Sequence, residues 1–192
     1  MKCTEQQKIP GYKTYKLNHT ESLADGSAIT IKYNITHKLY DDFDTDVLAV
    51  EIQTSLRPIK ISTTYLTPRR PYRSFTDIYR PLSNNIPTYI IGDFNARHKH
   101  YGNSEYNTLG KSLIDLINQG KLIHMGPYFP AYLHTNSATT LDKIFTNKHH
   151  YLNYIIEPGE ISTSVHIPII LRLSTKPFIT ETPFKYKTSK AN

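Results

Sequence analysis

The sequence has a single cysteine, Cys3, among its 192 residues, so no disulfide can form within the chain and no thiolate metal site can be assembled. No apolar run approaches the length of a membrane span, and the first residues, MKCTEQQKIPGYKTYK, lack the apolar stretch of a signal peptide. Internal repeats and low-complexity blocks are also missing, and the length favours one sizeable domain over two. These absences predict an intracellular protein in a reducing compartment.

Acidic residues are the scarcer charged class. The chain has 16 Asp and Glu against 23 Lys and Arg, which gives a net charge of +7 at pH 7 and a pI of about 9.3. A basic balance of this size fits a polyanionic partner such as nucleic acid, although many basic proteins carry such a charge only for solubility. With 38% hydrophobic and 20% charged residues, the composition is typical of a globular protein and not of a disordered one.

Several segments predict strands, because they are β-branched or alternating and are bounded by turn residues. They cover residues 27–33, 47–53, 59–66, 88–91, 121–125, 140–146, 152–157 and 166–174. A short helix is expected after Ser74, which could cap it. A longer helix is expected over residues 107–120, NTLGKSLIDLINQG, with Asn107 or Thr108 as its cap, its leucines on one stripe and Gly120 past its end. Many strands with helices between them indicate an α/β or α+β sandwich.

Residues 90–102, IIGDFNARHKHYG, end an apolar run with polar residues. On a strand, Asp93 and Asn95 would share one face and point into a cleft, while Phe94 would anchor in the core. Gly92 would allow a close backbone approach. An aspartate can act as a base towards water and an asparagine can hold an oxygen in place, but the pair alone also fits an ordinary turn or cap.

Other polar residues fit the same chemistry. Asp142 lies in the apolar segment TTLDKIFT, where an ionised group needs a partner, and His166 precedes an apolar strand in TSVHIPII. Such a pair would orient the imidazole and stabilise its cationic form beside a phosphate. Tyr65 ends IKISTTYL just ahead of Arg69 and Arg70, and all three side chains suit phosphate contact. Each residue alone also fits a structural role: an edge-strand carboxylate, a capping histidine, a packed aromatic.

The order of these segments resembles a known superfamily. A tyrosine ahead of a proline-rich turn, then GDFNA, LDKIFT and SVHIPI, is similar to the endonuclease/exonuclease/phosphatase proteins. More narrowly, KIPGYKTYKLNH, GSAITIKYNI and NARHKHYGNSEYNTLGKSLIDLI resemble the apurinic-endonuclease-like domain of LINE-type (non-LTR), jockey-like retrotransposons. The resemblance extends over residues 1–174, and residues 175–192 are expected to form a tail or linker.

The resemblance implies an α/β fold, a two-sheet β-sandwich flanked by helices (the DNase-I-like four-layer sandwich). In such a site Asp93 would be the base that activates the attacking water, and Asn95 would position the water or the phosphate. His166 would contact the phosphate, oriented by Asp142, and Tyr65 would be a supporting phosphate ligand.

The same resemblance implies Mg²⁺ or Mn²⁺ as the cofactor, with substrate contacts from Arg69, Arg70, Arg97 and His98. The domain would act in the nucleus, nicking one strand of chromosomal DNA to start reverse transcription, and would be fused to a reverse transcriptase in the parent element. The remaining histidines match no standard zinc spacing. His100 is expected in a loop near the cleft, and residues 149–150 in an exposed turn.

Several positions depart from the family pattern. Its S-D-H motif reads Ser164-Val165-His166 here, and valine offers no oxygen to a metal or its water. Glu5 lacks the E-T-H context of the family's metal-binding glutamate, Asp25 replaces a glycine, and tyrosine replaces the usual tryptophan at position 101. We therefore expect an amino-terminally truncated domain that misses its first strands and has impaired chemistry, because the metal supplies much of the charge stabilisation.

Two other functions remain open from the sequence. The first is a catalytically inactive, DNA-binding remnant that keeps a basic cleft. The second is a phosphatase acting on a small phosphorylated or lipid substrate, which the basic charge and the retroelement-like segments disfavour. Salt-dependent DNA binding without cleavage would support the remnant.

Overall fold

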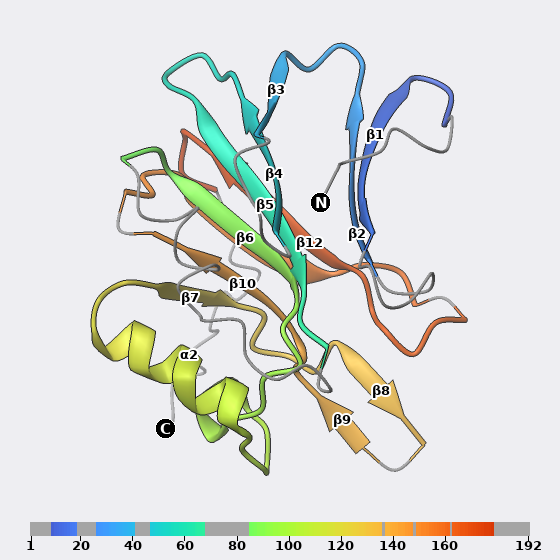
Figure 1. Ribbon diagram of the computed structural model, residues 1–192, viewed down its shortest axis with the longest axis vertical. Coiled ribbons are helices and arrows are strands. Elements are labelled where there is room, and N and C mark those ends of the chain that lie inside the picture. Colours follow the sequence, from blue (N-terminus) through green and yellow to red (C-terminus); the bar gives the residue numbers. More distant parts are fainter. Residues whose placement is uncertain are drawn as a thin grey trace, which may run out of the picture.

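A six-stranded mixed sheet forms the centre of the structure, a computed structural model that describes residues 9–18, 26–40, 47–67, 85–135, 137–147, 149–161 and 163–178. Its strand order is β3-β4-β5-β6-β10-β7 (Figure 1). The strands are β3 His37–Tyr40, β4 Val47–Ile52, β5 Ile59–Tyr65, β6 Thr88–Asp93, β10 Asp142–Thr146 and β7 Ile123–Gly126. Only the β5–β6 pair of this sheet is parallel, so the carboxyl-terminal ends of β5 and β6 lie side by side.

Two hairpins pack against this sheet. One pairs β1 Tyr12–Asn18 with β2 Gly26–Lys32, and the other pairs β11 Asn153–Pro158 with β12 Ile169–Ser174. The first buries Tyr15, Leu17 and Ile31 against β4, and the second packs against buried side chains of β6, β7 and β10. Ile52 and Ile61 contact both clusters, which places the hairpins on the same face of the sheet.

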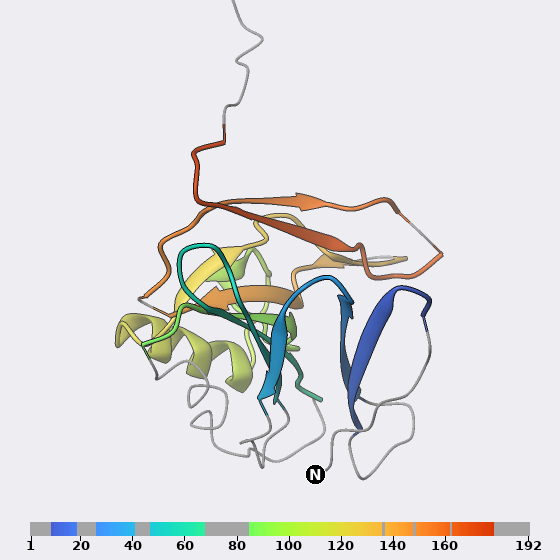
Figure 2. The same cartoon turned by 90° about the horizontal axis from the view of Figure 1, so that it is seen from above.

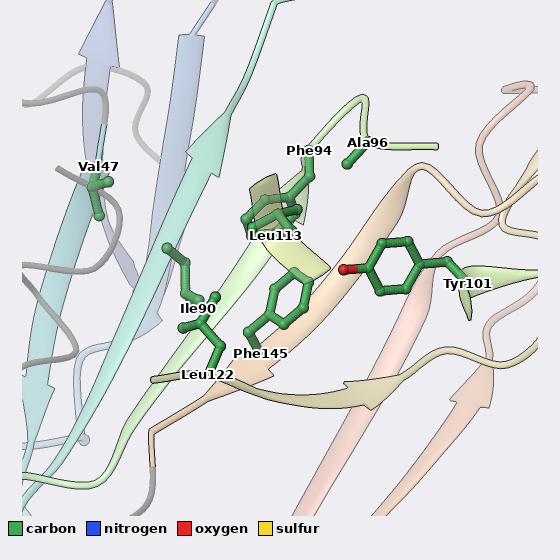
Figure 3. Packing of buried hydrophobic residues seen from close by; sticks show 8 residues of the cluster. All are labelled: Val47, Ile90, Phe94, Ala96, Tyr101, Leu113, Leu122 and Phe145. Atoms are coloured by element: carbon green, nitrogen blue, oxygen red, sulfur yellow. The ribbon is translucent and has the colours of Figure 1, made fainter. Parts of the chain in front are cut away.

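Helix α2 Thr108–Asn118 packs on the opposite face, as Figure 2 shows. Because side chains alternate along a strand, Ile90 and Phe94 point to the helix side while Tyr89 points to the hairpin side. The helix-side cluster is drawn in Figure 3 and includes Phe94 and Phe145 edge to face, with ring centroids 4.9 Å apart. Two hydrophobic layers therefore enclose the strand that carries Asp93.

The long helix was correctly predicted. Asn107 caps it by accepting a hydrogen bond from the Gly110 N–H, and Gly120 follows it with φ of +67°, as expected for a residue past the last turn. The leucine stripe predicted from the sequence, with Ile117, packs into the helix-side cluster. The short helix expected after Ser74 lies outside the described residues.

Every predicted strand is present, with shifted ends. The segment 121–125 becomes a strand only from Ile123, and the segment 166–174 only from Ile169, whereas β6 extends to Asp93. The sequence reading missed β1, β3 and the short hairpin of β8 Tyr132–His134 with β9 Ser137–Thr139. Within the described residues, no helix is both long and apolar enough to cross a membrane.

Candidate active site

Three of the predicted site residues form a row across neighbouring strands. The Cα of Asp93 pairs with Tyr65 on β5 and with Asp142 on β10. Residues directly opposite each other in a sheet project from the same face, so the three side chains emerge together at the end of the sheet. We call Tyr65, Asp93, Asp142 and His166, which contacts Asp142, the polar row.

A close contact between β5 and β6 supports this row. A Cβ atom on Gly92 would lie 1.9 Å from the Thr64 carbonyl oxygen, so only glycine fits at this position. Beyond the strand end, the Leu66 N–H donates to the Asp93 carbonyl oxygen at 2.9 Å. Any larger residue at position 92 would separate Tyr65 from Asp93.

The Asp93 carboxyl group is partly buried. Burial is the main cause that raises its pKa, and the neighbouring Asp142 carboxylate raises it further. The Asn95 N–H, which donates to Asp93 Oδ1 at 2.8 Å, and the positive charges of His166 and Lys143 oppose this increase. A carboxylate with a raised pKa is a stronger base than an ordinary aspartate, which suits the removal of a proton from water.

The position of Asn95 differs from the prediction. The strand ends at Asp93 and Asn95 has φ of 45°, so strand alternation does not place the two side chains on one face. Instead, Asn95 Nδ2 donates to the Leu66 carbonyl oxygen at 2.9 Å, which ties the loop to the end of β5. Within the described residues, Asn95 Oδ1 accepts no hydrogen bond, so it is available to a water molecule.

Asp142 and His166 form the predicted pair. Asp142 Oδ2 lies 2.8 Å from His166 Nδ1, and the side chains are 22% and 39% exposed, respectively. The ring of Tyr132 contacts the His166 ring edge to face at 4.9 Å, and their backbones form an isolated antiparallel bridge. Nε2, the other ring nitrogen, makes no hydrogen bond within the described residues.

Of the predicted substrate-binding residues, the structure describes only Arg97 and His98. The Arg97 guanidinium is exposed and lies 3.2 Å from Glu105 Oε2, while His98 Nδ1 accepts from the His100 N–H at the start of the 3₁₀ turn η2 Lys99–Tyr101. Both therefore lie in the loop that leads from Asp93 to α2. Arg69 and Arg70 lie outside the described residues, as do Glu5 and Asp25.

The structure also describes residues 149–150 and Val165, which the sequence analysis singled out. His149 and His150 lie in the expected turn, where the His150 N–H donates to the Asn147 carbonyl oxygen and the His149 N–H to Asn147 Oδ1, both at 3.3 Å. Both residues are half-buried, so the expected exposure is wrong. Val165, beside His166, is 46% exposed and its carbonyl oxygen accepts from the Leu133 N–H. The hairpin of β8 and β9 is thereby joined to the segment that carries His166, at the end of the sheet where β6 stops (Figure 1).

Asn107 is a site-supporting residue that the sequence reading treated only as a helix cap. Its Oδ1 accepts from the N–H groups of Gly110 and Arg97, at 2.9 and 3.0 Å, and its Nδ2 donates to the Asn95 carbonyl oxygen at 2.7 Å. A Cβ on Gly110 would lie 2.0 Å from the Arg97 carbonyl oxygen, so the helix rests directly on the loop. The spacing N-x-x-G, three residues from cap to glycine, was the available sequence signal.

Among the described residues, no three His, Cys, Asp or Glu side chains gather closely enough to hold a metal ion. Asp93 Oδ1 and Asp142 Oδ2 are already engaged by Asn95 and His166. The donor set in this part of the chain therefore does not fit a divalent cation on its own, and we derive no catalytic step through one.

Known relatives share this arrangement of segments. The family described as "Endonuclease-reverse transcriptase" matches residues 59–170. The RNA-directed DNA polymerase of the mobile element jockey from Drosophila funebris is 26% identical over 178 residues, covering 88% of this chain and 19% of the relative. Its counterpart from Drosophila melanogaster is 26% identical over 186 residues, covering 92% of this chain and 20% of the relative. The chain thus spans about a fifth of the curated relatives it matches.

A solved structure has the same fold. The endonuclease domain of TRAS1, a telomere-specific non-LTR retrotransposon, superimposes with a TM-score of 0.72 at 17% identity, covering 86% of this chain and 81% of that domain. This confirms the predicted endonuclease-type sandwich of sheets and helices. The family match, which includes Tyr65, Asp93, Asp142 and His166, agrees with the resemblance drawn from the motifs. The chain belongs to the endonuclease-reverse transcriptase family of LINE-type retroelements.

Proposed function

We propose that this chain is an endonuclease domain that hydrolyses a phosphodiester bond in DNA and so provides the end from which reverse transcription starts. The observation that carries the proposal is the polar row, in which a raised-pKa carboxyl group, a carboxylate–imidazole pair and a tyrosine share one end of the sheet. Proton abstraction from water and binding of a phosphate are the two tasks that this set of groups can perform.

Asp93 is the proposed base. Its ionised carboxylate takes a proton from the attacking water, while Asn95 Oδ1 accepts a second hydrogen bond from the same water and fixes its direction. The water oxygen then attacks phosphorus, the bond from phosphorus to the leaving sugar oxygen breaks, and that oxygen takes up a proton from solvent water. The left-handed turn at Asn95 brings its side chain back towards the strand ends, since Asn95 Nδ2 contacts the Leu66 carbonyl oxygen.

His166 is the proposed phosphate contact. Asp142 holds Nδ1 at 2.8 Å, so the Nε2 N–H of the imidazolium is directed outward towards a phosphate oxygen. Tyr65, one strand away from Asp93, is the proposed second donor to the phosphate. Arg97, exposed in the following loop, and His98 are proposed contacts to flanking phosphates of the DNA strand.

A divalent ion is part of the proposal because endonucleases of this family generally depend on one. The candidates are Mg²⁺ and Mn²⁺, and the described residues would need further ligands to hold either ion. The proposed site of action is the nucleus. The proposed partner in the parent element is a reverse transcriptase, because the jockey relatives are RNA-directed DNA polymerases.

We further propose that turnover is slow in this chain. Val165 precedes His166 where the family motif has an aspartate, and a half-exposed valine provides no oxygen at that point. The same observation favours a second candidate function, a DNA-binding domain without turnover. Both candidates draw on the net positive charge of the chain, and they differ only in chemistry.

Nicking of supercoiled plasmid by the wild type and by Val165→Asp, in Mg²⁺ and in Mn²⁺, tests the proposal. Faster nicking by Val165→Asp, at unchanged DNA affinity, is expected if the remaining groups are competent. No nicking by either protein, with both binding DNA, would reject the endonuclease and leave the DNA-binding candidate.

A further inference from the structure

Lys143 is a buried charged residue that the proposed chemistry does not use. It follows Asp142 on β10, pairs in register with Gly92 on β6, and is 0% exposed. Its Nζ donates a short hydrogen bond to the Thr140 carbonyl oxygen and lies 4.6 Å from the centre of the Tyr101 ring. A buried lysine is seldom tolerated without a compensating charge, so its surroundings need an explanation.

The groups around Lys143 come from four elements. Tyr101 of η2 offers a ring face, and His124 of β7 is held neutral at physiological pH, because burial lowers its pKa to about 4. The opposing negative charges are Asp93 of β6 and Asp142 of β10, and both favour the charged form of Lys143. Lys143 forms no direct ion pair with either carboxylate among the described contacts, so it acts on them through space.

The two carboxylates create an electrostatic problem. Asp93 and Asp142 stand directly opposite each other across β6 and β10, and like charges in that arrangement repel. The proposed function needs both ionised, Asp93 as a base and Asp142 as the acceptor for His166. His166 compensates from the exposed side, and Lys143 is placed on the core side of the same pair.

We propose that Lys143 is a positioning residue that favours the ionised form of Asp93 and holds the chain segment that carries Asp142. The inference rests on the proposed function, because it assigns Lys143 a task in the same site. Lys143 stands behind the polar row and touches no substrate in this scheme.

The hydrogen bond to Thr140 supports the second half of this role. The Thr140 N–H donates to Asn103 Oδ1 at 3.1 Å, and the Phe94 N–H donates to the Leu141 carbonyl oxygen at 3.1 Å. Together with Lys143 these contacts fix residues 140–141 immediately before Asp142. The backbone just before Asp142 is thus tied to Phe94, the residue that follows Asp93.

The titration behaviour of Lys143 supports the first half. Burial lowers the pKa of Lys143 to about 7, while Asp93 and Asp142 act to raise it. By reciprocity, the positive charge of Lys143 lowers the pKa of Asp93. Removing the lysine should therefore make Asp93 harder to ionise.

The test compares Lys143→Met with Lys60→Met by carbon NMR titration of the Asp93 carboxyl group. Lys60 is a matched control: it is also 0% exposed and packs over an aromatic ring, Tyr40, at 3.7 Å, but it lies at the far end of β5 from Tyr65. Lys143→Met should raise the Asp93 midpoint, because the substitution removes a nearby opposite charge. Lys60→Met should leave it unchanged. Equal midpoints in the two variants would overturn the inference.

A second measurement does not depend on the folding of a lysine variant. The Nζ of Lys143 is titrated by lysine side-chain NMR in the wild type and in Asp93→Asn. We expect a midpoint near 7 in the wild type and a lower midpoint in Asp93→Asn, whereas identical midpoints would overturn the inference. If the wild type fails to nick DNA, the proposed function fails, but both titrations still decide the role of Lys143. If it does nick, Lys143→Met should move the acid limb of the pH–rate profile upward and Lys60→Met should not.

Discussion

At the scale of single residues, the site combines side chains that favour function at the expense of stability. Burial raises the pKa of Asp93, so the folded protein binds this proton more tightly than the unfolded chain does. The contribution of Asp93 to the free energy of unfolding is therefore fully present below the unfolded pKa and is lost as pH rises through the folded pKa. At neutral pH the ionised carboxylate destabilises the fold.

The first prediction concerns how the stability contribution of Asp93 changes with pH. Asp93→Asn should raise Tm relative to the wild type at neutral pH, and the difference should shrink as pH falls below the pKa of an ordinary aspartate, because both proteins are then neutral at this position. The asparagine oxygen can still accept from the Asn95 N–H. Thermal unfolding followed by circular dichroism across this pH range measures the effect. A lower Tm for Asp93→Asn at neutral pH would contradict it.

Residues that interrupt an apolar pattern were predictable, and those that depend on the fold were not. Asp93, Asp142 and His166 stand out in the sequence because each ionisable side chain borders apolar residues. Lys143 gave no such signal, since a lysine in a strand is expected to face solvent, and its burial results from the loop and β7 that cover it. The pairing of Asp142 with Asp93 likewise depends on long-range strand order.

At the scale of elements, the loop after β6 and the first turn of α2 act as one unit. Asn107 accepts from Gly110 and Arg97 and donates to Asn95, so the helix cap also fixes the loop next to Asp93. The cap was predicted from the sequence, because Asn before a helical stripe is a local signal. Its contact with Asn95 was not, because residues 95 and 107 are joined by a loop of irregular structure.

The second prediction separates these two tasks of Asn107. Asn107→Ala should lower the free energy of unfolding by about 2 kcal/mol, from the lost cap and an unsatisfied Arg97 N–H. Asn107→Asp keeps both accepted hydrogen bonds and should be clearly more stable than the alanine variant. It loses the hydrogen bond donated to the Asn95 carbonyl oxygen, so we expect it to nick DNA as poorly as the alanine variant does. Urea unfolding and plasmid nicking are the measurements. Equal stability of the two variants, or normal nicking by Asn107→Asp, would contradict this account.

The hairpins show where element prediction failed. Strands β8 and β9 have three residues each and are largely exposed, so neither hydrophobic alternation nor length marked them in the sequence. Their position is set by pairing with the His166 segment, through the Leu133 N–H to the Val165 carbonyl oxygen and the Ile167 N–H to the Ala131 carbonyl oxygen. Strand β4 was recognised from its β-branched residues and the turn residues that bound it.

At the scale of the whole molecule, the polar row lies where β5 and β6 end and β10 begins. The two hairpins cover one face of this sheet and α2 packs on the other (Figures 1 and 2). The net charge of +7 favours association with a polyanion. This general organisation was predictable because strand count, helix pattern and charge are properties of the sequence as a whole. The position of the two hairpins on one face of the sheet was not predictable, because their packing depends on tertiary contacts.

The third prediction concerns salt. The logarithm of the affinity for a DNA duplex should fall linearly with the logarithm of salt concentration, by about 0.9 per phosphate contacted. Arg97→Ala should reduce the slope by about 1 if it contacts a phosphate. Arg172→Ala is the matched control, because Arg172 is also an exposed arginine paired with a glutamate, Glu157, but lies on β12. Equal slopes for the two variants would remove Arg97 from the proposed interface.

The most direct test of the central claim is plasmid nicking by the wild type, Asp93→Asn and the surface control Asp115→Asn on α2. The account predicts slow nicking that Asp93→Asn lowers by about 10²-fold or more, as expected for loss of a base, while Asp115→Asn leaves the rate unchanged. Equal nicking by the wild type and Asp93→Asn would contradict the assignment of the polar row as the hydrolytic site.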